Sequence, residues 1–206
     1  MITFMCKIIC ITNRKLCEGD FLRQIELIAR SKPAALVLRE KDLSPQEYRE
    51  LAKRVMRICE EYDVTCILHS FTDIAAELGA KAIHLPLQML LELPDETKKC
   101  FDVIGASCHS ADDAILAQKS GATYVTAGHV FATDCKKGLP PRGLDFLRDV
   151  CESVDIPVYA IGGISSDNFS MVCEAGADGA CVMSGLMTCS NPKDYLSKFR
   201  EENNIE

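Results

Sequence analysis

Eight short runs rich in β-branched and other apolar residues recur along the chain, and amphipathic stretches separate them. The runs lie at residues 7–13, 34–40, 65–70, 82–86, 103–108, 124–130, 157–163 and 179–185. Such alternation is typical of a parallel sheet built from repeated strand–helix units. Most runs are apolar throughout, as expected for strands that are covered on both faces. In a chain of 206 residues this pattern predicts an α/β fold with one domain over residues 1–206, a (β/α)8 TIM barrel.

Helix start signals follow several of these runs. They stand at Ser44 with Pro45 and Glu47, at Ser110 with Asp113, and at Asn191 with Pro192. The first has the spacing of a capping box with proline in the first turn. The fourth unit is ambiguous, because Pro94 within residues 87–100 predicts either one kinked helix or two short ones. A doubly wound open sheet remains the alternative architecture.

Composition excludes several classes of protein. The 23 basic and 30 acidic residues give a net charge of -7 without a block of five like charges, which disfavours a nucleic-acid or anionic-membrane partner. No apolar run approaches the roughly 20 residues of a membrane span, and the N-terminal run predicts a strand instead of a signal peptide. The 12 cysteines show no zinc-like spacing, so we interpret them as reduced thiols in a cytoplasmic protein.

Glycine turns end the last two predicted strands. The residues concerned are Ile161, Gly162 and Gly163 after the seventh run, and Met183, Ser184 and Gly185 after the eighth. Glycine lets backbone N–H groups approach an anion, and the loops after the last two strands are the recurrent phosphate site of the barrel fold. These six residues are therefore predicted to bind phosphate. The alternative is that both segments are only tight turns.

The longest non-periodic segment is the loop at residues 128–143. Long loops in compact barrels are uncommon unless they are functional, and a lid over a ligand is a frequent reason for one. Lys136, Lys137 and Arg142 would place cations over a phosphate, unless the loop is simply a solvated basic segment. Cys135 lies in the same loop, and we interpret it as incidental.

Segments spread over nearly the whole chain, from Lys7 to Leu186, resemble the thiamine phosphate synthase superfamily. They are residues 36–44, 103–110, 124–138, 157–165 and 176–185. The resemblance implies a TIM barrel. Its synthase members join a phosphorylated thiazole to a pyrimidine pyrophosphate with the help of magnesium, so a small thiazole phosphate is the expected partner.

The chain departs from the synthase pattern where metal-binding carboxylates are expected. Synthases have an Asn-Asp pair after the third strand and a Gly-Gln-Glu-Asp-like segment after the fourth. The matching positions here are His69 and Ser70, and then residues 86–89, which end in Met89. Magnesium requires oxygen ligands, and a methionine thioether does not replace a carboxylate. Neither a metal ion nor another cofactor is therefore expected.

A second departure points to a different branch of the superfamily. Synthases have a proline after the glycine that ends the sixth strand, whereas this chain has His129, and its loop resembles that of TenI-type thiazole tautomerases, in which this histidine is catalytic. Histidine suits proton transfer near neutral pH in both directions. The resemblance therefore predicts an isomerase that aromatises a carboxylated thiazole phosphate, with His129 as the catalytic residue.

Other polar residues at predicted strand ends complete the expected site. Arg39, Lys41, His69, Ser107 and Lys136 are predicted to bind substrate. We expect a structural role for His84, and His109 is left open between ligand contact and rim structure. Two further functions remain as alternatives: a thiamine phosphate synthase, and a non-catalytic regulatory protein that binds thiazole phosphate. The sequence defines no oligomeric state, and a homodimer is compatible with it.

Overall fold

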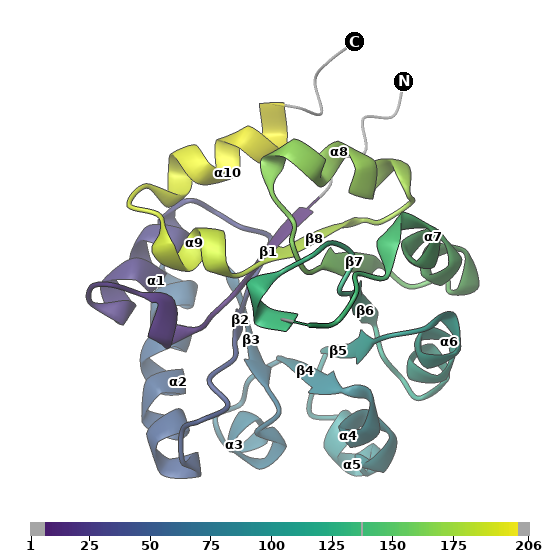
Figure 1. The fold of residues 1–206 in the computed structure, drawn as a ribbon. Coiled ribbons are helices and arrows are strands. Elements are labelled where there is room, and N and C mark those ends of the chain that lie inside the picture. Colours follow the sequence, from purple (N-terminus) through teal and green to yellow (C-terminus); the bar gives the residue numbers. More distant parts are fainter. Residues whose placement is uncertain (1–6, 137, 202–206) are drawn as a thin grey trace.

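A computed structural model describes residues 7–136 and 138–201, and in them eight parallel strands close into a barrel (Figure 1). The strands are β1 (Lys7–Ile11), β2 (Ala35–Leu38), β3 (Thr65–His69), β4 (Ala82–Pro86), β5 (Val103–Cys108), β6 (Tyr124–Gly128), β7 (Val158–Ile161) and β8 (Gly179–Val182). The ring closes because β1 pairs with β8, with Ile9 opposite Cys181. The (β/α)8 prediction is confirmed, and the open-sheet alternative is wrong.

Helices surround the ring of strands (Figure 1). They are α1 (Phe21–Arg30), α2 (Pro45–Glu61), α3 (Thr72–Glu77), α4 (Leu87–Glu92), α5 (Asp95–Lys98), α6 (Ala111–Lys119), α7 (Gly143–Ser153), α8 (Ser166–Glu174), α9 (Ser184–Thr188) and α10 (Pro192–Glu201), with the 3-10 turns η1 (Arg14–Leu16) and η2 (Asp134–Lys136). The ambiguous fourth unit forms two short helices, α4 and α5, on either side of Pro94.

The predicted helix starts differ in how their caps are made. At α2 the capping box is complete, because the Ser44 side chain accepts from the Glu47 N–H while Glu47 accepts from the Ser44 N–H. At α6 the Ser110 hydroxyl oxygen accepts from the Asp113 N–H, but Asp113 accepts in return from the His109 N–H. Asp113 therefore links the helix cap to His109, at the end of the preceding strand.

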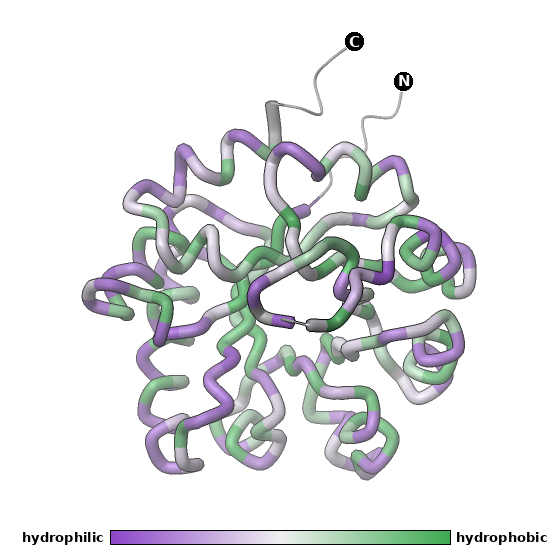
Figure 2. The backbone as a smooth tube through the Cα atoms, in the orientation of Figure 1, coloured by the Kyte–Doolittle hydropathy of each residue, from purple (hydrophilic) through white to green (hydrophobic). Residues whose placement is uncertain are grey.

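Two apolar layers result from the alternation of side chains along each strand. The barrel interior contains Ile9, Ile11, Ala35, Val37, Ile67, Ala82, Tyr124, Tyr159 and Cys181. The strand residues between these, such as Ile8 and Cys10, face the helices. They form a larger apolar cluster with the helix side chains that face the barrel. Figure 2 shows this arrangement as apolar strands inside helices that alternate between apolar and polar positions. Each large side chain buried completely contributes about 1.5–3 kcal/mol to folding.

The segment between β6 and α7 lies over the middle of the ring in the view of Figure 1. It leaves the carboxyl end of β6, where functional groups gather in barrels of this type. The side chains of Lys137 and Cys135, noted in the sequence, lie outside the described part of the structure. Within residues 7–136 and 138–201, none of the helices has the length and apolar character needed to cross a membrane.

Candidate functional site

Four polar side chains on β3 to β6 form a connected group that extends from Tyr124, the first residue of β6, to His69, the last residue of β3. His69, His84, Ser107 and Tyr124 make up this group, which we name the histidine network. His84 Nδ1 lies 2.9 Å from the Tyr124 hydroxyl and its Nε2 lies 2.8 Å from the Ser107 hydroxyl. The rings of His69 and His84 stack with centroids 5.7 Å apart. Cross-strand register creates the group, because His69 lies opposite His84.

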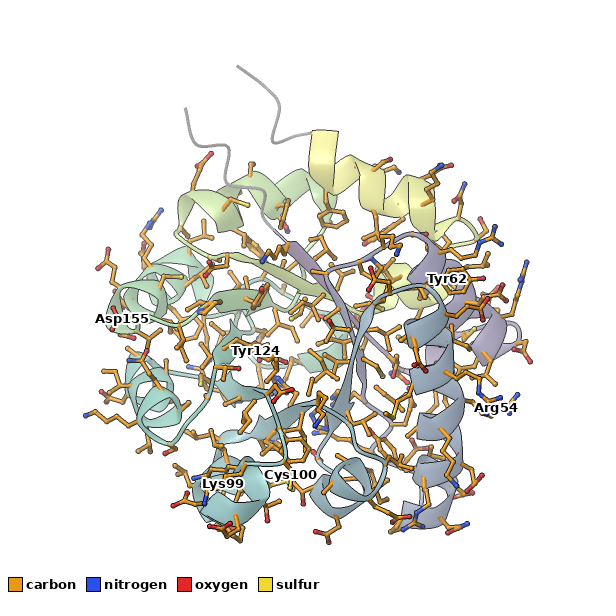
Figure 3. The ribbon with its side chains drawn as sticks, turned by 180° about the vertical axis from the view of Figure 1, so that it is seen from behind. Arg54, Tyr62, Lys99, Cys100, Tyr124 and Asp155 are labelled. Carbon is orange, nitrogen blue, oxygen red and sulfur yellow. The ribbon has the colours of Figure 1, made fainter. Side chains whose placement is uncertain are left out.

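Tyr124 reaches His84 across an intervening strand, and Gly105 provides the space. In the strand register His84 pairs with Gly105, and Gly105 pairs with Tyr124. A Cβ atom at Gly105 would overlap the Tyr124 ring. Glycine within a strand often marks such a close approach. Figure 3 shows Tyr124 inside the ring of strands, whereas Arg54 points away from the barrel on α2.

Burial of Tyr124 sets the direction of the hydrogen bonds in the histidine network. Among the described residues the buried Tyr124 hydroxyl has one hydrogen-bond partner, His84 Nδ1. A buried O–H group without an acceptor is costly, so Tyr124 donates to Nδ1. The neutral His84 ring then carries its proton on Nε2 and donates it to Ser107. The Ser107 hydroxyl is left as a donor toward a ligand.

Both histidines of the network are held in their neutral form. Burial, with smaller effects from Arg39 and Lys41, lowers the pKa of His84 to about 4. Burial, with smaller effects from His84, Lys41 and Arg39, lowers the pKa of His69 to about 2. The His69 ring also lies 2.7 Å, at Nδ1, from the Ser70 hydroxyl. The network therefore supplies neutral hydrogen-bonding groups and no positive charge near neutral pH.

A pocket of about 300 Å³ is lined by the end of β6 and by residues that follow β5 and β6. We name it the loop pocket, and its wall consists of His109, Gly128, His129, Lys136, Leu139, Pro140, Pro141 and Arg142. His129 and Lys136, both predicted from the sequence, lie together in it. His109 and Arg142 join them, so four of its eight residues carry nitrogen-bearing side chains.

The two histidines of the loop pocket are held by backbone carbonyls. His109 Nδ1 lies 2.8 Å from the Gly128 oxygen, and because a carbonyl only accepts, Nδ1 carries the proton. In the neutral ring Nε2 is then an acceptor. His129 Nε2 is 3.4 Å from the Leu139 oxygen, a long contact that restrains the ring only weakly. The Gly128–His129 peptide bond is cis.

The glycine turn after β7 packs directly against the loop pocket. A Cβ atom on Gly162 would overlap the Cβ of His129, and one on Gly163 would overlap the Ala132 carbonyl oxygen. Phe131 also donates its N–H to the Gly162 oxygen over 3.0 Å. Both glycines have positive φ, +99° and +66°. Their positions therefore shape the wall behind His129, in addition to any contact with phosphate.

In the turn after β8, a contact with α10 requires the glycine. A Cβ atom on Gly185 would overlap the hydroxyl of Tyr195 on α10. Met183 precedes the five-residue helix α9, which Ser184 and Gly185 begin. Phosphate binding at Ile161 and the other five glycine-turn residues stays a prediction.

Cationic side chains approach the network from the segment after β2. Arg39 and Lys41 lower the pKa values of both network histidines, and the charges of Arg39 and Lys136 add to burial in lowering the pKa of Lys41. Glu40 lies between them in sequence but is bound elsewhere, by the Thr12 hydroxyl at 2.7 Å and the Arg14 N–H at 2.9 Å. Arg39 and Lys41 therefore lie close enough to the histidine network to affect its pKa values, and Lys136 lies close enough to Lys41 to affect that of Lys41.

Sequence reasoning identified part of this site and missed Tyr124. Lys136 lines the loop pocket, Ser107 and His69 belong to the histidine network, and His84 has both ring nitrogens bonded within the protein. Substrate binding by Arg39, Lys41, His69, Ser107 and Lys136 stays a prediction. Tyr124 resembles any apolar strand residue in the sequence. The available signal was Gly105, an isolated glycine inside a predicted strand.

Comparisons with known proteins connect this geometry to a family. Residues 8–186 match the family described as "Thiamine monophosphate synthase". The chain is 34% identical over 194 residues to the thiamine-phosphate synthase of Clostridium acetobutylicum, with 91% of this chain and 90% of the relative covered. For the Pyrococcus abyssi thiamine-phosphate synthase the identity is 34% over 196 residues, with 95% and 93% covered.

A solved structure gives the same result. Thiamine phosphate pyrophosphorylase from Pyrococcus furiosus superimposes with a TM-score of 0.83 at 30% identity, covering 98% of this chain and 99% of that one. These relatives bear the names of synthases, so the predicted thiazole tautomerase activity is wrong and the synthase alternative is favoured. The tautomerase prediction rested on local departures at Ser70, Met89 and His129, whereas the similarity to synthases extends along the whole chain. The chain belongs to the thiamine monophosphate synthase family, which is a family of enzymes.

Proposed function

We propose that this protein is a thiamine phosphate synthase, which joins a phosphorylated thiazole to a pyrimidine carried on pyrophosphate. The observation that carries the proposal is the identity of 30–34% with proteins of that activity along almost the entire chain. The donors and cations at the barrel mouth support it. Both substrates are phosphorylated, and Arg39, Lys41 and Lys136 supply positive charge near the Ser107 hydroxyl.

The reaction balances without an oxidant or an added proton donor. A bond forms between the thiazole ring nitrogen and a carbon of the pyrimidine substrate, while the bond from that carbon to a pyrophosphate oxygen breaks. The leaving pyrophosphate takes the electron pair. Negative charge therefore grows on the leaving group, and fixed donors directed at growing charge are an effective form of catalysis.

The residues of the mouth have separate roles in this reaction. The Ser107 hydroxyl donates to the pyrophosphate, because His84 and Tyr124 hold it in the required direction. Arg39 and Lys41 neutralise pyrophosphate charge, as does Lys136, which lies close enough to Lys41 to help lower its pKa. His129 forms part of the pocket wall and transfers no proton, since the balanced reaction needs none.

The resemblance also implies magnesium, and the donor set of this chain does not fit that ion. Ser70 and Met89 stand where the synthases carry aspartates, and neither supplies a carboxylate oxygen. In residues 7–136 and 138–201, no group of three or more His, Cys, Asp or Glu side chains is arranged to hold a metal ion. We therefore assign no step to a metal.

The test is turnover by the purified chain with both phosphorylated precursors. Mass spectrometry should detect thiamine phosphate, with one pyrophosphate released per product. Ser107→Ala should lower kcat about 100-fold, the usual cost of losing one donor to a developing anion. Lys81→Ala is the matched control, since Lys81 precedes β4 at the opposite end of the barrel. Product no faster than in a protein-free reaction would refute the proposal and favour a protein that only binds the ligand.

A further inference from the structure

We infer that the barrel mouth binds pyrophosphate through side-chain cations alone, without a divalent metal ion. The inference rests on the proposed function, because it concerns how the leaving group of that reaction is held. It departs from the magnesium requirement that the resemblance implies. Three features of the structure support it. The positions of the metal ligands lack carboxylates, the carboxylates after β2 are bound to other partners, and three cations lack an ion-pair partner among the described residues.

The two positions that correspond to metal ligands are used for other contacts. Met89 lies on α4, where its side chain is partly buried and packs against the apolar core. Ser70 follows β3 with a φ of +66°, and its hydroxyl lies 2.7 Å from His69 Nδ1. One position is therefore apolar, and the other holds a neutral hydroxyl already engaged with a ring nitrogen. Neither offers the charged oxygen that magnesium prefers.

The carboxylates after β2 are committed to other partners. Glu40 is buried and accepts from Thr12 and Arg14. Asp42 receives two hydrogen bonds from the Arg14 guanidinium, at 2.6 and 2.8 Å, and also pairs with Lys15 at 2.9 Å. Recruiting either carboxylate to a metal would break these pairs. Strong pairing also keeps the pKa of Asp42 well below its usual range.

Arg39, Lys41 and Lys136 differ from Arg14 and Lys15, because within the described residues none of the three has an ion-pair partner. Their charges instead repel one another, and this repulsion adds to burial in lowering the pKa of Lys41. Unbalanced cations that face one space are stabilised when an anion enters it.

The charges at the mouth match those of pyrophosphate. A pyrophosphate ester carries about two to three negative charges near neutral pH, since the second ionisation of a phosphate lies near pH 6. The three cations carry a similar positive charge, and the guanidinium of Arg39 can contact two oxygens at once. His69 and His84 are neutral and add hydrogen bonds only. A divalent ion would raise the positive charge at the mouth without finding a carboxylate to hold it.

Isothermal titration of the full chain with inorganic pyrophosphate tests the inference. The protein is treated with a chelator and titrated at low ionic strength, once with excess chelator and once with magnesium. We expect the Kd with chelator to lie within about threefold of the Kd with magnesium. Lys41→Ala should weaken binding at least about tenfold in both buffers, as expected for a charge-assisted contact. Lys81→Ala, at the other end of the barrel, should bind like the unmodified chain.

Three results would overturn the inference: binding that requires magnesium, no binding in either buffer, or unchanged binding by Lys41→Ala. Lys41 is exposed, so its substitution removes charge without opening the core, and circular dichroism of each variant verifies folding. The readout is separate from turnover. Metal-free binding without product would refute the synthase proposal alone, whereas product formation with magnesium-dependent binding would refute this inference alone.

Discussion

The histidine network and the loop pocket both use residues on or just after β5 and β6, yet the chain builds them in different ways. The network is held by strand register and a buried phenol, with His84 bonded at both ring nitrogens. The loop pocket is formed by a segment after β6, and the Nε2 of His129 has only a 3.4 Å contact there. The difference indicates that the network is preorganised, whereas the pocket wall has room to adjust to a ligand.

The largest expected effect is on folding, from Gly105→Ala. The new Cβ overlaps the Tyr124 ring inside the barrel, and overpacking of a core costs about 1–3 kcal/mol. Urea unfolding should show a loss of about 2–3 kcal/mol. Gly19→Ala is the control, because a Cβ there meets no atom within 4 Å. Equal unfolding midpoints for the two variants would mean that Gly105 does not hold the network in place.

The next largest effect is expected for Tyr124→Phe. It removes the donor to His84 Nδ1 without creating a large cavity, and leaves a buried ring nitrogen without its partner. Such a loss costs about 1–2 kcal/mol. Tyr62→Phe is the control, because Tyr62 contacts Glu26 at a part-buried surface position, 3.2 Å away, and should change stability by about 0.5 kcal/mol or less. If both variants are equally stable, the phenol does not organise the network.

Acid should destabilise the protein through the network. The pKa of His84 is lowered to about 4 in the folded protein, whereas an unfolded histidine titrates near about 6.5. The unfolded chain therefore binds more protons between these values. The contribution of His84 to the free energy of unfolding is fully present above about pH 6.5. It falls as the pH drops toward 4, by at most about 1.4 kcal/mol per pH unit. His69, whose pKa is lowered to about 2, adds a slope of the same sign.

His84→Gln isolates this contribution. Its urea unfolding midpoint should fall less steeply than that of the unmodified chain between about pH 6.5 and 5, above the range in which most carboxylates titrate. Parallel curves would show that His84 does not titrate differently in the folded and unfolded states.

The smallest effect on stability is expected in the loop pocket. Lys136 is exposed, so Lys136→Ala should change the free energy of unfolding by about 0.5 kcal/mol or less. The same variant should lower kcat/KM for the pyrophosphate substrate at least about tenfold, because it removes one of three cations. Calorimetry and turnover on one preparation give both values. A destabilised but fully active variant would reverse the proposed division between the two regions.

The fold was accessible from the sequence because its signals are local. Each strand is a short run that is mostly apolar throughout, and the Ser44 capping box lies within four residues. The network was not accessible in the same way. The Tyr124–His84 contact joins residues 40 apart through the register of three strands, and no local pattern encodes that register.

The loop pocket shows the other limit of sequence reasoning. His129 and Lys136 line one pocket, because both lie in one short loop. Their chemistry was inferred from the resemblance of the loop and from the missing carboxylates at Ser70 and Met89, and the predicted isomerase was wrong. His109 reaches the same pocket from the end of β5 because its ring bonds to Gly128, a contact between strands that the sequence left open.

Nitrogen-15 NMR of the histidine rings tests the difference between the two regions most directly. Near pH 7.5 the neutral His84 ring should be protonated on Nε2, because Tyr124 donates to Nδ1, whereas His109 should be protonated on Nδ1, which donates to the Gly128 carbonyl. Tyr124→Phe should disturb the His84 signals and leave those of His109 unchanged. Protonation of His84 on Nδ1, or a charged His84 ring at that pH, would contradict the preorganised network.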